Sequence, residues 1–249
     1  LRVPDAAREE PEWLRDLKSA VDIRFIRTER LVGLPSGVAR PHGPGRPGLM
    51  PTITTYSDEL ANEIKSTLAK YAELSQSLDR TFPVRLVSQP AYQTLTKEAL
   101  TEKLKAFEQT RGRLAAAGLL DREQHPQFVV PETIDDTKSS VLSVYVRDVE
   151  QKLGVFDSMV AKIDLFTSII NRRFRHKQLS ISRENGLTFT TESGQPLPAL
   201  QLSSGEQHEV VLLYELLFKA GRNSLVLIDE PEISLHVAWQ EQFLRDLLE

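Results

Sequence analysis

The sequence predicts an α/β fold in which a long helical segment is inserted into a core that contains a β-sheet. Around residue 23, apolar and charged residues alternate with the period of two that is typical of a half-buried strand. Between residues 52 and 175, apolar residues recur every three or four positions, as in helices that pack through one face. Near the C-terminal end, the apolar run 225–228 has the composition of a strand buried on both faces.

The composition is that of a globular protein. The chain has 249 residues, 40% of them hydrophobic, which is enough for one large domain or two smaller ones. Because it has no cysteine, disulfides and cysteine-based zinc sites are excluded. The net charge of -4 argues against a globally basic nucleic-acid-binding domain. No apolar stretch approaches the roughly 20 residues that cross a bilayer, so we expect a cytoplasmic protein without a membrane span.

Residues 1–51 are expected to form part of the core around a strand near 21–27. Arg27 and Arg30 follow this strand and are placed to approach a nucleotide or a partner subunit. A structural salt bridge, with Glu29 or another carboxylate, is the more ordinary role for such arginines.

Prolines and glycines alternate from Gly33 to Pro51, which predicts a loop without regular hydrogen bonding. A glycine-rich loop can cradle phosphate, but prolines remove the N–H donors that a cradle needs, and no lysine follows. We therefore do not assign a phosphate site to this loop.

Residues 52–175 are expected to form a helical arm inserted between two pieces of the core. The first helix has Ser57 or Asp58 as its N-cap, and Pro83 is expected to end it.

A second helix is expected to open near Thr96 and to stop at Gly118. The third and longest pattern covers 142–174 in a heptad-like register that only Thr167 interrupts. The basic cluster 172–177 at its end complements a helix C-terminus, and contact with nucleic acid is the less common alternative.

Residues 176–249 are expected to return to the core. Two short alternating runs flank Asn185 and Gly186, a pair that suits a type I′ turn, so a β-hairpin is predicted. A helix over about 206–220 and the strand 224–228 follow.

Two features of this last segment carry chemistry. A Ser/Gly turn that opens a helix, as at Ser203 and Gly205, presents free N–H groups and a positive dipole end to a phosphate. Asp229 and Glu230 at the end of a strand can hold Mg²⁺ and polarise water. Each has a structural alternative: Ser203 with Glu206 is also a capping box, and both carboxylates suit the start of a following helix.

In this order, with one helix between them, these features resemble the signature motif and Walker B of ABC-type ATPases. The resemblance is to the branch that contains chromosome-maintenance (SMC), DNA-repair and OLD-like proteins. It implies a partial ABC-type ATPase core with the P-loop NTPase fold, ATP and Mg²⁺ as ligands, and a head-to-tail homodimer that closes on the nucleotide.

The resemblance also assigns roles to individual residues. Asp229 would support Mg²⁺, and Glu230 would be the catalytic residue that orients or deprotonates the attacking water. The residues implied in ATP binding are Ser203, Ser204, Gly205 and Glu206 of the signature, and Ser234 and His236 of the D-loop. Ser204 departs from the glycine more usual there but is small enough to fit.

The glycine-rich G-x-x-x-x-G-K-[ST] loop of such ATPases is missing from the sequence. We therefore expect a fragment that lacks Walker A and does not hydrolyse ATP by itself.

The organisation also resembles stand-alone ATPases of bacterial antiphage defence, such as the Septu-type ATPase that works with an HNH nuclease. This resemblance implies control of a nuclease partner, with DNA or RNA as a further partner. The alternative is a non-hydrolytic, ATP-gated scaffold. A transporter subunit is disfavoured, because the insertion before the signature is longer than a transporter's helical subdomain.

Overall fold

The computed structural model describes residues 11–33, 50–88, 94–120, 136–221 and 223–230. These residues form a mixed α/β structure with mostly helical content. Internal contacts divide the chain into two compact units. We call Leu1–Ile53 with Leu202–Glu249 the strand unit, and Thr54–Gln201 the helical unit.

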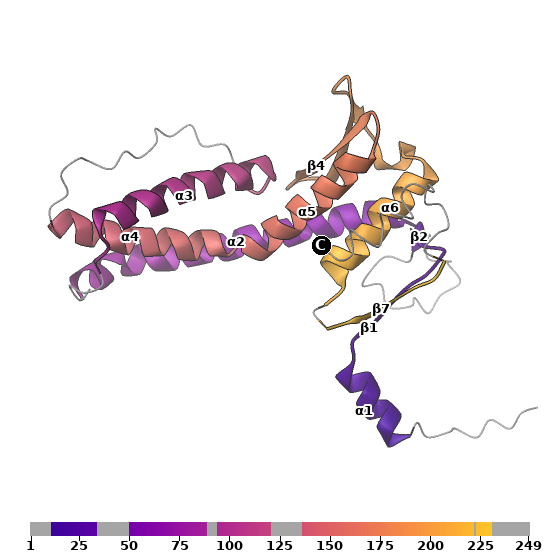
Figure 1. Cartoon of the computed structure of the whole chain (residues 1–249), viewed down its shortest axis with the longest axis horizontal. Helices are drawn as coiled ribbons and strands as arrows, with labels where there is room; N and C mark the ends of the chain where they lie inside the picture. Colours follow the sequence, from indigo (N-terminus) through magenta and orange to yellow (C-terminus); the bar gives the residue numbers. More distant parts are fainter. Residues whose placement is uncertain (1–10, 34–49, 89–93, 121–135, 222, 231–249) are drawn as a thin grey trace, which may run out of the picture. The chain divides into compact units, whose positions relative to one another are not determined.

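The strand unit contains both strands that the sequence predicts for the core, β1 and β7 (Figure 1). They pair in parallel, from Ile23 opposite Leu225 to Ile26 opposite Ile228. Its elements are α1 (Glu12–Ala20), β1 (Ile23–Ile26), β2 (Val32–Gly33), β3 (Met50–Pro51), α6 (Ser204–Tyr214), the π-helical turn η3 (Glu215–Lys219) and β7 (Leu225–Ile228). The short strands β2 and β3 pair antiparallel.

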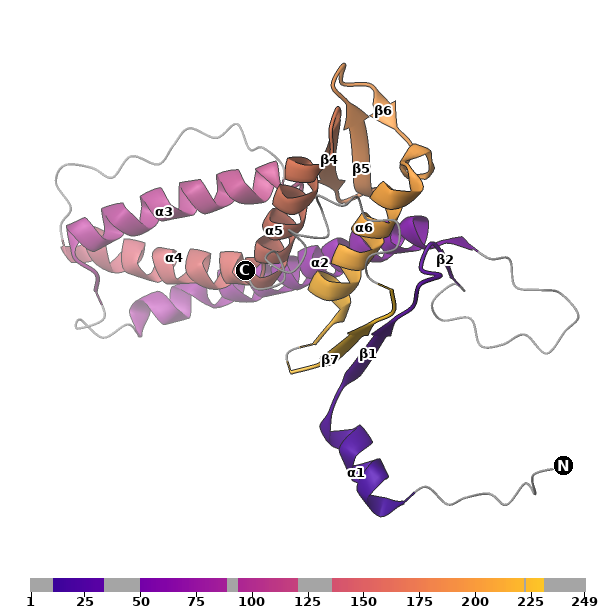
Figure 2. The ribbon, with the colours of Figure 1, turned by 45° about the vertical axis from the view of Figure 1, so that its right-hand side comes forward.

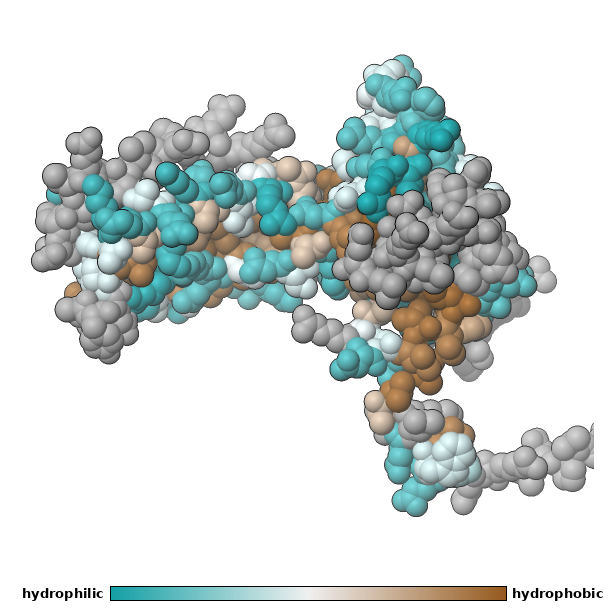
Figure 3. Space-filling model, in the orientation of Figure 1, coloured by the Kyte–Doolittle hydropathy of each residue, from teal (hydrophilic) through white to brown (hydrophobic). Residues whose placement is uncertain are grey.

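The two faces of the β1–β7 pair differ, and the prediction of a strand buried on both faces is wrong. On one face, Ile26 and Leu212 of α6 form a buried cluster that Leu216, Val226 and Ile228 complete. On the other, the side chains are about half exposed: Ile23 49%, Phe25 55%, Leu225 48% and Leu227 45%. This apolar surface appears brown over β1 and β7 in Figure 3. Among the described residues only one layer, α6 with η3, packs against the pair, so one face stays open.

The helical unit is built from long helices, as predicted, but their boundaries differ. Its helices are α2 (Thr52–Val87), α3 (Lys97–Ala116), α4 (Asp136–Gly154) and α5 (Asp157–Arg173). Helix α3 agrees with the prediction at both ends, because Thr96 is its N-cap and Gly118 follows it with a φ of +71°. Helices α3 and α4 lie side by side in Figures 1 and 2.

Helix α2 neither begins at Ser57 or Asp58 nor ends at Pro83. It starts at Thr52, directly after β3, and continues through Pro83 to Val87. A proline inside a helix leaves carbonyls of the preceding turn without a backbone donor. On the far side of Pro83, Arg85 Nη2 donates to the carbonyl oxygen of Leu78 at 2.7 Å, a contact that joins the residues before and after the proline. The same guanidinium pairs with the buried Asp148 of α4, which holds this end of α2 in place.

The third helical pattern is two helices rather than one. Helix α4 ends at Gly154 and α5 begins at Asp157, whereas the predicted interruption was at Thr167. Phe156, between the two helices, is fully buried and its ring lies 5.2 Å from that of Tyr71. The apolar register therefore survives the break, which explains why the sequence pattern did not reveal it.

The predicted hairpin is present as β4 (Lys177–Ser182) and β5 (Gly186–Thr191), with β6 (Pro196–Leu197) beside β5 (Figure 2). Its turn is not the predicted type I′ turn. Ser182 pairs with Gly186, so Arg183 to Asn185 form the loop, and of the Asn-Gly pair only Gly186 has a positive φ, +64°. By its contacts the hairpin groups with the helical unit, together with the 3₁₀ turn η2 (Ala199–Gln201).

Two further predictions bear on the surface of the molecule. The cations Arg172 and Arg173 lie in the last turn of α5, where they complement the helix C-terminus. In the part of the chain that the structure describes, no helix combines the length and apolarity of a membrane span.

Candidate functional site

The candidate site lies at the carboxyl ends of β1 and β7. Because the two strands are parallel, the residues that follow them meet at one edge of the pair. Asp229 donates its backbone N–H to the carbonyl of Ile26 at 2.9 Å, which extends the strand ladder to the acidic residues. In α/β proteins with parallel strands, ligands bind at this edge.

A threonine holds the first carboxylate in place. Thr28 Oγ1, just beyond β1, donates to Asp229 Oδ2 at 2.7 Å and lies 3.5 Å from Glu230 Oε2. The side chains of Asp229 and Glu230 are exposed and therefore accessible to a ligand. The sequence analysis missed Thr28. The available signal was a small hydroxyl residue directly after a strand that pairs with the strand ending in Asp-Glu.

The backbone of Glu230 is strained. Its φ is 45°, in the left-handed region that residues other than glycine rarely adopt. Such a conformation costs about 1–3 kcal/mol and persists only where the surroundings hold it. Arg30 Nη2 donates to the carbonyl oxygen of Glu230 at 3.4 Å and contributes to that support.

Arg30 is a buried cation behind the carboxylates, with only 6% of its surface exposed. Its Nε donates to Nδ1 of His208 at 3.0 Å. Burial lowers the pKa of Arg30, and the nearby Asp229 partly opposes this shift. The expectation of a carboxylate salt bridge is not met among the described residues, where Arg30 bonds to an imidazole and a backbone carbonyl instead.

His208 lies in α6 and is itself buried. Burial lowers its pKa, and the positive charge of Arg30 lowers it further. Because a guanidinium can only donate hydrogen bonds, Nδ1 of His208 must be unprotonated to accept one. The geometry therefore requires the neutral imidazole with its proton on Nε2.

The predicted phosphate-binding residues are at the N-terminus of α6. Ser203 is the N-cap and forms a complete capping box with Glu206. Ser203 Oγ accepts the N–H of Glu206 at 3.3 Å, and Glu206 Oε2 accepts the N–H of Ser203 at 2.7 Å. The structural alternative for this pair is thus present.

The capping box leaves other donors at the same helix end. Ser203 and Ser204 are exposed and Gly205 is half-buried. Among the described residues, no acceptor bonds the N–H groups of Ser204 or Gly205. An anion could therefore reach these amides without disrupting the cap.

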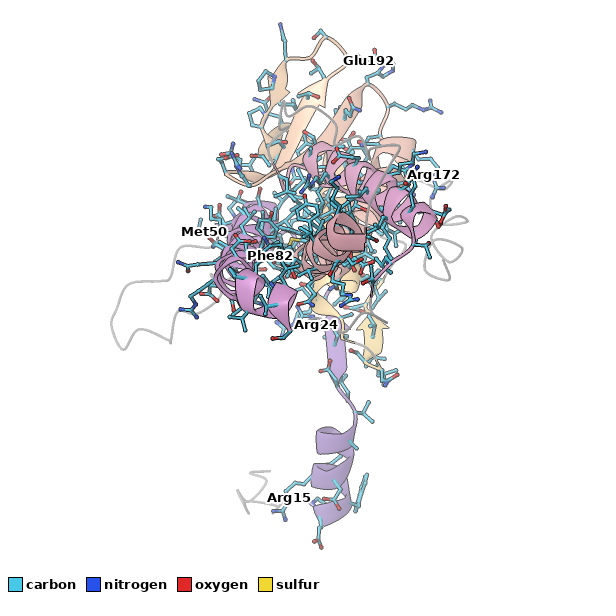
Figure 4. The ribbon with its side chains drawn as sticks, turned by 90° about the vertical axis from the view of Figure 1, so that its left-hand side faces the viewer. Arg15, Arg24, Met50, Phe82, Arg172 and Glu192 are labelled. Carbon is cyan, nitrogen blue, oxygen red and sulfur yellow. The ribbon has the colours of Figure 1, made fainter. Side chains whose placement is uncertain are left out.

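An ion pair joins η3 to β1. Arg24, labelled on β1 in Figure 4, donates through Nε to Glu215 Oε2 at 2.7 Å. Glu215 is buried where the α-helix widens into the π-helical turn. This pair joins β1 to η3, whereas the cluster around Ile26 and Leu212 packs α6 against the strand pair.

The predicted site residues thus form two groups. Asp229 and Glu230 stand together beyond β7, and Ser203 to Glu206 stand together at the start of α6. Ser234 and His236 lie outside the described residues.

The first group suits a hard cation. Carboxylate and hydroxyl oxygens are ligands that Mg²⁺ accepts, and Mg²⁺ usually takes only one or two carboxylates with water and phosphate oxygens. No cluster of three or more potential metal-ligating side chains exists in the described part of the chain, so a complete protein cage is absent there. The donor set fits a magnesium ion that arrives with a phosphate-bearing ligand.

Comparison with known proteins agrees with this chemistry. A family model described as "AAA domain, putative AbiEii toxin, Type IV TA system" matches residues 50–249. No curated protein matches the chain.

Proposed function

Because this chain belongs to that AAA domain family, whose fold is that of P-loop NTPases and whose general activity is nucleotide binding and ATP hydrolysis, we propose that Asp229 and Glu230 serve ATP hydrolysis. The observation that carries this proposal is the exposed acidic pair at the carboxyl edge of two parallel strands, held by Thr28. We assign Asp229 to Mg²⁺, through a water molecule, and Glu230 to the attacking water.

In this proposal Thr28, Asp229 and Glu230 each have one role in hydrolysis. A bound Mg²⁺ would neutralise charge on the phosphates as the terminal phosphoryl group is transferred. Thr28 bonds to Asp229 and keeps it in one orientation, and the carboxylate of Glu230 lies 3.5 Å from the same hydroxyl. Glu230 then accepts or orients the proton of the water that attacks the phosphorus.

We assign the second group to the other side of the nucleotide. Ser203, Ser204, Gly205 and Glu206 would meet the triphosphate held by a second copy of the protein, so two copies would close head to tail. The exposed Ser203 and the available amides of Ser204 and Gly205 support this role. Ser234 and His236 would lie at the same dimer interface.

The sequence contains no Gly-Lys-Ser/Thr, so we assign none of its residues to a phosphate loop. We propose that residues outside these 249 supply it, and that the 249-residue chain alone binds no ATP productively. We further propose that the chain is part of an ABC-type ATPase of the SMC/OLD-like branch, from the order of Ser203–Glu206, one helix, and Asp229–Glu230.

For the biological setting, we propose control of a nuclease or nucleic-acid-associated complex in bacterial antiphage defence, in the cytoplasm. The family description names a toxin–antitoxin system. The second candidate is a scaffold that binds ATP without hydrolysing it and holds a complex together.

Glu230→Gln in the full-length protein tests the catalytic assignment. This change removes the proton acceptor but keeps the shape of the side chain, so we expect phosphate release to fall at least about 100-fold while a fluorescent ATP analogue still binds. The control is Glu192→Gln, which changes an exposed carboxylate of the hairpin, labelled in Figure 4, and should leave turnover unchanged.

Normal turnover in Glu230→Gln would remove Glu230 from its role. If the wild-type protein binds ATP, releases no phosphate and holds its partner equally well with a non-hydrolysable analogue, the scaffold is the correct function.

A further inference from the structure

Arg30 bridges the two groups of site residues, a property that the proposed function does not use. Through Nε it bonds to His208 in α6, the helix that begins at Ser203. Through Nη2 it bonds to the backbone carbonyl of Glu230. A single rigid guanidinium therefore links the helix of one group to the backbone of the other.

We propose that Arg30 is a positioning residue that makes the placement of the Glu230 carboxylate depend on the position of α6. The proposal rests on the proposed function, since it concerns the residue assigned there to the attacking water. Arg30 does not touch the substrate in this scheme. It acts through His208 on one side and Glu230 on the other.

The burial of Arg30 supports a specific role. Removing a cation from water is costly, and a buried guanidinium normally uses its donors fully. Nη1 of Arg30 has no hydrogen-bond partner among the described residues, and no carboxylate there pairs directly with the group. Fold stability would be served more simply by an apolar side chain, so the two bonds that Arg30 makes explain its presence better than packing does.

The strain at Glu230 shows what the link controls. The left-handed backbone at Glu230 persists only where other groups hold it. One such group is Arg30, which follows β1 and donates to the carbonyl of Glu230. If α6 shifts, His208 moves with it. The donors of the Arg30 guanidinium have a fixed planar arrangement, so the guanidinium must move with His208 to keep their hydrogen bond. A displacement of about 1 Å at a reacting group lowers turnover by about 100-fold, so a small shift would be enough to switch the site.

The first experiment measures ATP turnover in the full-length protein. Arg30→Met keeps the apolar stem but removes both bonds. We expect kcat to fall about 10- to 100-fold with KM for ATP changed less than about twofold. His208→Phe should reproduce this loss, whereas His208→Asn, which offers an acceptor near the position of Nδ1, should restore most of kcat.

Arg24→Met is the matched control. Arg24 is the other arginine that connects β1 to the α6–η3 layer, but it bonds to Glu215 and not to the acidic turn. Its loss should lower stability without the selective loss of kcat, because the buried cluster of Ile26 and Leu212 still packs α6 against the strands. The proposal would be overturned if Arg30→Met left kcat unchanged, if it raised only KM, or if Arg24→Met and Arg30→Met lowered kcat equally.

The second experiment needs no ATPase activity. Chemical unfolding of the 249-residue chain with Arg30→Met, His208→Phe and both changes forms a double-mutant cycle. We expect the double variant to be little less stable than either single one, because both remove the same bond. Additive losses would disprove the link. A wild-type protein without turnover would overturn the proposed function and the catalytic part of this proposal, whereas the cycle would still report on the link itself.

Discussion

At the scale of single residues, one chemical pattern can serve stability and function together. Ser203 and Glu206 form a capping box, yet the exposed amides of Ser204 and Gly205 remain available for an anion. Loss of an N-cap side chain costs about 1 kcal/mol, so a functional effect of Ser203→Ala must be separated from a stability effect. Thr28 and Arg30 show the reverse case, in which side chains with no motif of their own hold the residues of a motif.

The buried His208 makes stability depend on pH. Its folded-state pKa lies below the value of 6.5 that it has when unfolded. Between these two values the unfolded chain binds more protons, so the free energy of unfolding falls as the pH drops below about 6.5. Each unit of depression corresponds to about 1.4 kcal/mol. Urea unfolding from pH 8 to pH 5 should show this loss in the wild type.

His208→Asn should flatten that part of the pH profile, because asparagine does not titrate. His176→Asn is the matched control, since His176 is exposed, bonds to Glu192 at the surface and has a φ of 61° that asparagine tolerates. An unchanged pH profile in His208→Asn would contradict the assignment of a neutral buried imidazole.

At the scale of elements, the hairpin is fixed to α2 and α5 by side chains of these helices that bond to its backbone. Ser57 Oγ donates to the carbonyl of Asn185 at 2.6 Å and accepts the N–H of Leu187 at 2.8 Å. Asn171 of α5 binds both backbone groups of Leu179, at 2.6 and 2.9 Å. The hairpin is therefore attached to two helices of its own unit by hydrogen bonds that depend on close approach.

Gly186→Ala tests this close approach. A Cβ at Gly186 would lie 1.9 Å from the carbonyl oxygen of Ser57, and the residue has a positive φ. We expect the variant to lose roughly 2–5 kcal/mol of stability from the clash and the backbone strain together, measured by chemical unfolding.

Gly194→Ala separates the two causes. Gly194 also has a positive φ, +76°, but no atom lies within 4 Å of the added Cβ. It should lose only about 1–2 kcal/mol. Equal losses in both variants would show that the contact with Ser57 is not what makes glycine necessary at 186.

At the scale of the whole molecule, the candidate site residues belong to one of the two units. The strand unit carries the acidic pair and the start of α6, and one face of its strand pair is apolar and half exposed. The helical unit has a buried apolar core, and ion pairs such as Lys152 of α4 with Asp79 of α2, at 2.8 Å, also link its helices.

Head-to-tail closure predicts association that depends on ATP. In the full-length Glu230→Gln protein, which would keep its nucleotide, sedimentation should show dimers with Mg²⁺ and ATP but not with ADP. Ser204→Arg should abolish the dimer, because a long side chain at this exposed position would occupy the space of the phosphates. Ser88→Arg, an exposed change beyond the end of α2, should not. Dimers that form equally with ATP, with ADP and in Ser204→Arg would contradict the assigned interface.

The sequence by itself determined the elements whose signals are local. The strands β1 and β7, the helix α3 with Thr96 and Gly118 at its ends, the hairpin and the acidic pair after β7 all follow from periodicity, caps and turn residues within a few positions of one another. The tertiary structure decided the rest. Thr28 bonds to Asp229 although 201 positions separate them, and Arg30 bonds to His208 across 178 positions. The break after Gly154 leaves the apolar register unchanged, so the sequence pattern does not show it. The exposure of one face of β7 depends on which elements pack beside it. Periodicity reports which side of an element is apolar, but pairing between distant segments alone decides which polar groups come within hydrogen-bond distance.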